Sequence, residues 1–141
     1  MPAVATVRAV SSPIHHLTVI RYFRDGRHWE STDILSPSWP DVVTAIERMD
    51  DFCYPIVQLN CTADEEDETI FNVIGGDGSY ALFHQMGEWE YTDPNGSDEE
   101  VRLWQSDQGY FCKRRNVLTD LDEVLRLTRI FYETGSYESL A

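Results

Sequence analysis

A handful of side chains in this sequence have the chemistry for catalysis. Four histidines could act as general acids or bases: His15, His16, His28 and His84. Glu30, Asp33 or the acidic loop at residues 64–68 could supply a carboxylate partner, and Cys53 could act as a nucleophile. None of them stands at a diagnostic spacing, because His-Glu-x-x-His, Gly-x-Ser-x-Gly and His-x-Glu with a later Cys-x-x-Cys are all absent. We therefore predict no catalytic residue, no metal site and no cofactor.

Three glycines in one short run, Gly75, Gly76 and Gly78, could cradle a phosphate. A phosphate loop lies between a strand and a helix whose free N–H groups point at the anion. Residues 79–86 are instead rich in aromatic side chains, which is typical of a strand, and no Gly-Lys-Ser/Thr ending follows the run. Because residues 69–74 also favour a strand, the sequence predicts a hairpin turn whose glycines take positive φ.

Negative charge dominates the composition, with 25 acidic and 11 basic residues and a formal net charge of -14. Such a surface repels phosphates, and the one basic cluster, residues 113–115, is too small to reverse the field, so nucleic acid is not an expected partner. The charge could serve solubility alone. The acids are bunched rather than interspersed with bases, however, which favours complementarity to a basic protein partner.

The densest acids form a loop over residues 64–68, and a second acidic stretch surrounds two aromatic residues. Binding hot spots favour Trp, Tyr and Arg within a polar rim. The predicted partner-binding residues are Asp64, Glu65, Glu66, Asp67, Glu68, Glu88, Trp89, Glu90, Tyr91 and Asp93. For the two aromatic residues an orientation toward the core is an open alternative.

The length of 141 residues is typical of a single domain, here residues 1–141, and the 42% hydrophobic content supports a folded core. No apolar run approaches the about 20 residues that cross a bilayer, and the N-terminus lacks the pattern of an export signal. Three cysteines without Cys-x-x-Cys spacing fit a reducing compartment. We expect a cytoplasmic protein without membrane association, and the oligomeric state stays open.

The elements that would position these residues follow from periodicity and turn signals. The expected strands cover residues 15–23, 27–32, 55–61, 69–74, 79–86, 101–104 and 109–112, and the pattern continues over 89–91. The expected helices cover residues 39–50 and 120–134, with caps at Ser38 and Thr119 and a stop at Gly135. The predicted fold is α+β: a mostly antiparallel sheet of about five to seven strands with two main helices packed on it. Residues 1–14 are expected to form a loose arm.

Four segments within about residues 40–140 carry a family resemblance. They read DVVTAIERMDDFCYPIVQL, FNVIGGDGSYALFHQ, GEWEY and RRNVLTDLDEVLRLTRIFYETGSY, with the acidic loop between the first and the second. In this order they resemble the first-numbered family of immunity proteins of bacterial polymorphic toxin systems. In that family a helix and a strand precede a hairpin with a glycine turn. The family's last helix stops at an aromatic residue shortly before Thr-Gly, and Phe131 to Gly135 match that ending.

The resemblance implies a cytoplasmic protein without catalysis that binds a cognate toxin and blocks its active site. Toxins neutralised by such families are often nucleases or deaminases, and a toxin that acts on nucleic acid needs a basic cleft, which an acidic inhibitor suits. Two alternatives stay open. One is an acidic mimic of nucleic acid that inhibits a restriction or CRISPR nuclease, and the other is a small-molecule enzyme that uses a histidine.

Overall fold

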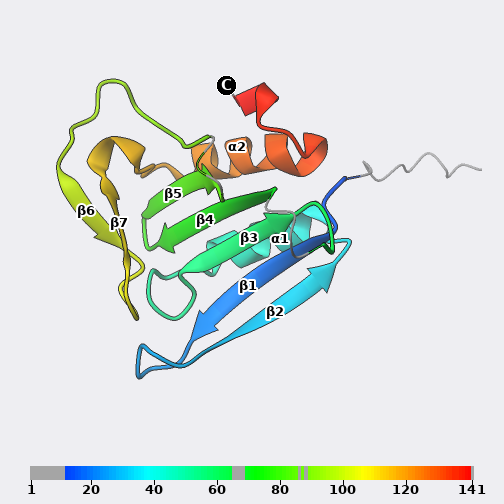
Figure 1. Ribbon diagram of the computed structural model, residues 1–141, viewed down its shortest axis with the longest axis horizontal. Coiled ribbons are helices and arrows are strands. Elements are labelled where there is room, and N and C mark those ends of the chain that lie inside the picture. The colour runs from blue at the N-terminus through cyan, green and yellow to red at the C-terminus, as the bar shows by residue number, and fades with distance from the viewer. Residues whose placement is uncertain (1–11, 65–68, 86, 88, 141) are drawn as a thin grey trace, which may run out of the picture.

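A five-stranded antiparallel sheet forms the centre of the fold (Figure 1). The computed structural model describes residues 12–64, 69–85, 87 and 89–140. The strands of this sheet are β1 (His16–Tyr22), β2 (Trp29–Leu35), β3 (Ile56–Asn60), β4 (Ile70–Gly76) and β5 (Ser79–His84). Their order across the sheet is β2-β1-β3-β4-β5, and each neighbouring pair is antiparallel. The predicted α+β class is confirmed.

Two further strands, β6 (Glu100–Leu103) and β7 (Tyr110–Lys113), form a separate antiparallel hairpin. They do not extend the main sheet because other segments occupy the outer edge of β5. Leu118 exchanges both backbone hydrogen bonds with Tyr80, at 2.8 and 2.7 Å, and the Tyr91 N–H donates to the Leu82 carbonyl at 2.9 Å. The strand predicted over residues 89–91 is thus reduced to a single bridge between Glu90 and Phe83.

The glycine run forms the predicted hairpin. Asp77 and Gly78 make the turn between β4 and β5, and both have positive φ, 54° and 93°. Gly75 and Gly76 are the last residues of β4, and the second forms a bridge with Asp50 in the connection after the first helix. Because a strand follows the turn, the run does not lead into a helix N-terminus of the kind that binds phosphate.

The two main helices begin with side-chain caps. Helix α1 (Trp39–Glu47) begins at the predicted cap, Ser38, which is part of a capping box: Ser38 and Asp41 bond to each other's backbone N–H. Helix α2 (Leu121–Thr134) is capped by Asp120 rather than by the predicted Thr119. Asp120 has the extended backbone of an N-cap, and its carboxylate accepts from a backbone N–H two residues on at 3.0 Å. Gly135 ends α2 in the left-handed conformation, as predicted.

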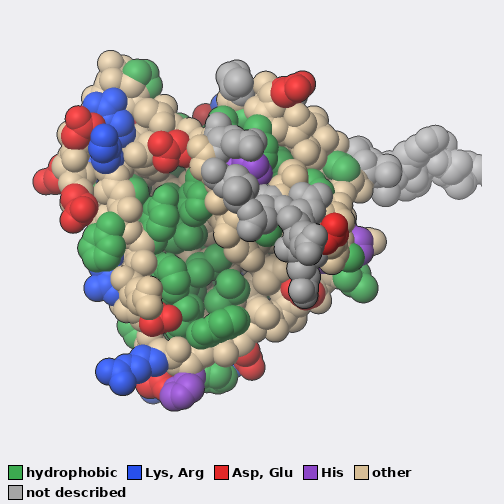
Figure 2. All heavy atoms as spheres, in the orientation of Figure 1, with side chains coloured by type: hydrophobic (Ala, Val, Ile, Leu, Met, Phe, Trp, Pro, Cys, Tyr) green, Lys and Arg blue, Asp and Glu red, His purple; other side chains and the backbone are tan. Residues whose placement is uncertain are grey.

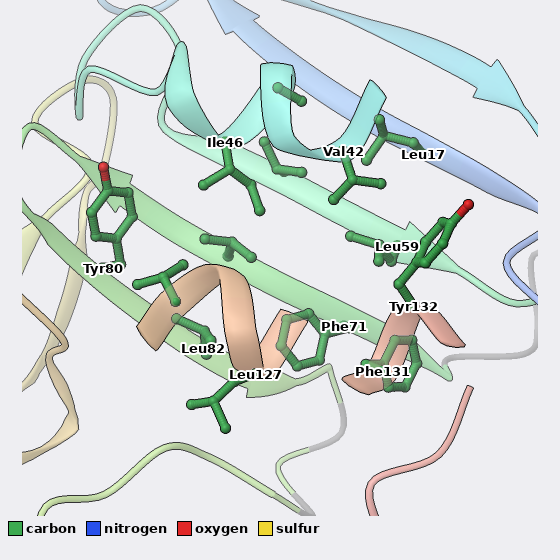
Figure 3. Packing of buried hydrophobic residues seen from close by; sticks show 14 of the residues in the cluster. Leu17, Val42, Ile46, Leu59, Phe71, Tyr80, Leu82, Leu127, Phe131 and Tyr132 are labelled. Carbon is green, nitrogen blue, oxygen red and sulfur yellow. The ribbon is translucent and has the colours of Figure 1, made fainter. Parts of the chain in front are cut away.

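Both helices pack on one face of the sheet and bury the main hydrophobic core between them and the strands (Figure 3). The sheet residues of this core alternate along the strands: Leu17, Val19, Val57, Leu59, Phe71, Val73, Tyr80 and Leu82. Phe71 stacks on Phe131 of α2 with ring centroids 5.0 Å apart. No helix among the described residues is both long and apolar enough to cross a membrane.

The start of the described chain is attached to this core. The Ser12 hydroxyl donates to the Tyr132 carbonyl at 2.6 Å, and Ile14 is buried. The prediction of a loose arm over residues 1–14 is therefore wrong for residues 12–14, because an apolar side chain in this stretch fills the core beside α2. Residues 1–11 lie outside the described residues.

Candidate partner-binding surface

Two acidic segments that are distant in sequence leave the sheet at the same end. The connection from β3 to β4 begins after Asn60 and returns at Ile70, and β5 runs back to that end and stops at His84. The Gln85 N–H donates to the Ile70 carbonyl at 3.0 Å, so the exit of β5 lies beside the entry of β4. Of the predicted acids on these connections, Asp64 is exposed. Glu65, Glu66, Asp67, Glu68 and Glu88 lie outside the described residues.

The two predicted aromatic contacts, Trp89 and Tyr91, face the core. Both rings are half-buried and pack against the main hydrophobic cluster. Trp89 stacks on Phe71 with ring centroids 5.9 Å apart and lies 5.8 Å from Tyr137. Glu90, between them, points to the opposite face and is exposed, since alternate residues of an extended segment point to opposite sides. The sequence alone left open whether these two aromatic residues face a partner or the core, and in the structure both face the core.

The face of the sheet opposite the helices is partly covered by the β6–β7 hairpin. Figure 2 shows hydrophobic side chains gathered over the middle of this face, beside the hairpin. On this face the sheet and the hairpin enclose a second, smaller hydrophobic cluster: a row across four strands, Ile20, Ile56, Ile74 and Ala81, over which Leu103 of β6 packs. We call this side of the molecule the outer face. It is the side from which a partner could reach apolar surface that the helices do not cover.

A cleft of about 510 Å³ lies between the hairpin and residues 90–92, and we call it the outer cleft. Its lining residues are Glu90, Thr92, Asp98, Glu100, Tyr110, Phe111, Cys112, Lys113, Arg115 and Asn116. Phe111 is 56% exposed at its rim, and Arg102 lies over its ring at 5.8 Å. The sequence alternation of β7 could have indicated Phe111, because its neighbours Tyr110 and Cys112 face the sheet.

The basic triplet at residues 113–115 is bound by the acids of the opposite strand segment. Arg115 pairs with Asp98 at 2.7 Å, and Lys113 lies 3.8 Å from the same carboxylate. Arg114 pairs with Glu99 at 2.8 Å. Within the described part of the chain no ion pair engages Glu90 or Glu100. With Asp98 they make three carboxylates against Lys113 and Arg115 in the lining of the outer cleft, a formal net charge of -1.

Asp93 has a structural role in the turn that leads to β6. Its carboxylate accepts from the Asn95 N–H at 2.9 Å, and its own N–H donates to the Arg115 carbonyl at 2.7 Å. A side chain that holds the turn in this way is less available for a partner. Two of the ten predicted contact residues, Asp64 and Glu90, are thus exposed in the structure. Unlike Trp89 and Tyr91 they do not pack on the core, and unlike Asp93 they do not hold this turn.

Burial changes the titration of Tyr110, whose ring stacks on Phe83 with centroids 5.1 Å apart. Burial, together with the negative charges of Cys112 and Glu90, raises the pKa of Tyr110 to about 12. In the unfolded chain the pKa of tyrosine is about 10. Between about pH 10 and about pH 12, therefore, the Tyr110 hydroxyl has lost its proton in the unfolded chain but keeps it in the folded protein. Stability is therefore lost as pH rises through this window, and Tyr110 has no such effect below it.

We expect Tyr110→Phe to remove part of this alkaline destabilisation. On going from about pH 9 to about pH 11, the free energy of unfolding should fall by about 1 kcal/mol less in the variant than in the unchanged protein. Urea unfolding at the two pH values measures the difference. Tyr22, whose pKa is also raised to about 12, is present in both proteins and cancels. Equal losses in the two proteins would show that Tyr110 titrates like an exposed tyrosine.

The candidate catalytic residues are scattered over the molecule. His84 is 5% exposed and lies against the ring of Tyr137, with centroids 4.4 Å apart. His28 pairs with Asp25 in an exposed turn, and His15 and His16 bond to each other through their Nδ1 atoms at 2.8 Å. In the described ranges no group of three or more His, Cys, Asp or Glu side chains is arranged to hold a metal ion.

Comparisons with models of protein families, with curated proteins and with solved structures found no match to this chain. Its function must therefore be argued from the surface itself. That surface combines the exposed Asp64, at the end of the sheet where β3 stops, with the outer cleft, where Glu90 and Glu100 lie beside the exposed ring of Phe111. This composition suits the binding of a basic protein.

Proposed function

We propose that this chain is a non-catalytic, cytoplasmic immunity protein that binds a basic toxin domain and blocks its active site. The observation that carries the proposal is the distribution of charge. Acidic segments distant in sequence leave the sheet at one end, while the basic triplet is bound by Asp98 and Glu99. The negative field is therefore not offset by a free basic cluster nearby, and it would attract a partner with a positive cleft.

The toxin that fits this surface acts on nucleic acid, as a nuclease or a deaminase. Such an enzyme needs cationic side chains to hold phosphates, and carboxylates can occupy the same side chains in place of the substrate. The formal net charge of -14 would speed the encounter, and aromatic surface would slow dissociation. We assign the aromatic contact to Phe111, because Trp89 and Tyr91 are packed on the core.

We expect charge reversal at the acidic surface to slow association with the toxin. Changing residues 64–68 together to lysine, or Glu90 alone, removes steering charge, and the loop variant should lose about tenfold or more in association rate at low salt. Phe111→Ala should mainly speed dissociation. The measurement is binding kinetics against the toxin domain encoded directly upstream, at low and high salt, together with rescue of growth in a bacterial host that expresses that domain.

Glu47→Lys is the matched control for Glu90→Lys. Both glutamates are exposed, neither has an ion pair among the described residues, and each change adds the same charge, but Glu47 lies on α1 behind the sheet. The control should keep the association rate of the unchanged protein to within about twofold. Tight binding that ignores both ionic strength and these reversals would refute the acidic surface. Binding to a restriction or CRISPR nuclease instead of the toxin would identify a mimic of nucleic acid.

A further inference from the structure

Among the residues that the structure describes, the edge strand β2 has backbone partners on one side only. β1 pairs with it on one side, in a register where Val19 opposes Thr32. The Ser36 N–H donates to the His15 carbonyl, and the Phe23 N–H donates to the His28 carbonyl, both at 2.9 Å. The even-numbered residues of the strand therefore bond to β1, and by alternation the N–H and C=O groups of residues 29, 31, 33 and 35 point outward. No backbone hydrogen bond within the described ranges reaches these outward groups.

β2 lacks several of the features that usually protect an edge, and its charged side chains are two, Glu30 and Asp33. It is seven residues long and contains no proline, lysine or glycine. The opposite edge of the sheet is closed, because residues 89–91 and Leu118 bond to β5. Two large apolar side chains lie on β2 itself, Trp29 at 55% and Leu35 at 68% exposure. A long edge with exposed apolar side chains is a template for pairing with another strand.

The sequence of β2 is complementary to itself in one antiparallel register, centred on Thr32. In that register Trp29 of each copy opposes Leu35 of the other, so the two exposed apolar side chains cover each other. Ser31 opposes Asp33, and Glu30 opposes Ile34, so no like charges lie directly opposite. The backbone N–H and C=O groups that point outward belong to odd-numbered residues. In this register each odd-numbered residue opposes an odd-numbered residue of the other copy, so the two sets of groups can form hydrogen bonds with each other.

The charge near this edge differs from that of the whole chain. The hairpin of β1 and β2, residues 16–35, contains three acidic residues and three arginines, so its formal net charge is zero against -14 for the chain. The acids are Asp25, Glu30 and Asp33, and the bases are Arg21, Arg24 and Arg27. Repulsion between two copies at this edge is therefore weaker than the net charge of the chain suggests. One acid outside the hairpin, Asp64, lies near its Leu35 end, where it lines a pocket with Asp33 and Leu35.

We propose that two copies of this chain associate through β2 in this register, about a two-fold axis at Thr32, and form one continuous sheet across the interface. The pairing satisfies the outward backbone groups of both copies and buries the Trp29 and Leu35 side chains. It leaves the outer cleft of each copy outside the interface, whereas Asp64 lies beside it, because Asp64 lines a pocket with Asp33 and Leu35. The dimer does not depend on the toxin-binding proposal.

Sedimentation equilibrium of the full chain tests the association. A dimer should form with rising protein concentration, and salt should strengthen it by screening the net negative charge of the copies and the diagonal pair of Asp33 carboxylates. The same rise in salt concentration should weaken toxin binding, which depends on attraction between opposite charges. Ser31→Pro removes an outward N–H without touching the bonds to β1, and should weaken the dimer about tenfold or more. Ser31→Ala, which keeps that N–H, should dimerise like the unchanged chain.

Cysteine cross-linking tests the register and does not depend on the proline variant folding. In the proposed register Thr32 lies directly opposite Thr32 of the second copy, at a non-hydrogen-bonded position of the antiparallel pair. The Cα atoms at such a position are about 4.5 Å apart, which a disulfide can span. Thr32→Cys should therefore form a covalent dimer on mild oxidation. Glu30→Cys and Ile34→Cys should each fail alone and cross-link when mixed. A chain that stays monomeric at every concentration, or a dimer that forms none of these links, would overturn the proposal.

Discussion

Gly76→Ala is expected to lower the free energy of unfolding by about 3 kcal/mol or more. A Cβ atom at this position would lie 2.6 Å from the Asp50 nitrogen and 2.6 Å from the Met49 carbonyl carbon. Both are backbone atoms, so no side-chain rotation relieves the overlap. The φ of Gly76 is 126°, which is unfavourable for any residue with a Cβ. The end of β4 and the connection after α1 would have to separate.

Gly78→Ala is the control for this substitution. Its φ is also positive, at 93°, but a Cβ there would meet nothing within 4 Å. The cost should be limited to backbone strain, about 1 to 2 kcal/mol. Urea unfolding of both variants gives the comparison. Equal losses would mean that the close approach at Gly76 contributes nothing and that only backbone conformation matters.

Phe71→Ala is expected to cost about 3 to 5 kcal/mol, because it would leave a large cavity in the core. The Phe71 side chain is 0% exposed. Its ring stacks on Phe131 at 5.0 Å, on Trp89 at 5.9 Å and on Tyr137 at 6.1 Å, so its removal affects α2, the segment after β5 and the C-terminal tail together. Thermal and urea unfolding measure the loss.

Phe111→Ala makes the same chemical change on the surface. At 56% exposure the ring buries little, and its contact with Arg102 is worth at most about 1 kcal/mol. A large loss of stability from Phe111→Ala would contradict its place at the rim of the outer cleft. A small loss combined with faster toxin release would separate its binding role from the structural role of Phe71.

Only the tertiary structure could show which predicted contacts are free to bind. The glycine run and the β-branched and aromatic residues around it predicted a hairpin of strands over residues 69–74 and 79–86, but such local patterns do not say which face meets the core. Trp89 and Tyr91 turn inward and pack against the main core cluster, where Trp89 stacks on Phe71. The uneven charge was evident from composition, yet the pairing of Arg115 with Asp98 required the register of β6 and β7.

The sequence by itself determined the elements whose signals are local: the Ser38 capping box, the Asp77–Gly78 turn and the Gly135 stop each depend on residues within a few positions of one another. It also determined the excess of negative charge, which is a sum over the chain. The tertiary structure decided that the β6–β7 hairpin stands apart from the main sheet and that β2 is left with an open edge. Those outcomes depend on hydrogen bonds between segments far apart in the chain, such as Tyr80 with Leu118, and local propensity does not specify them.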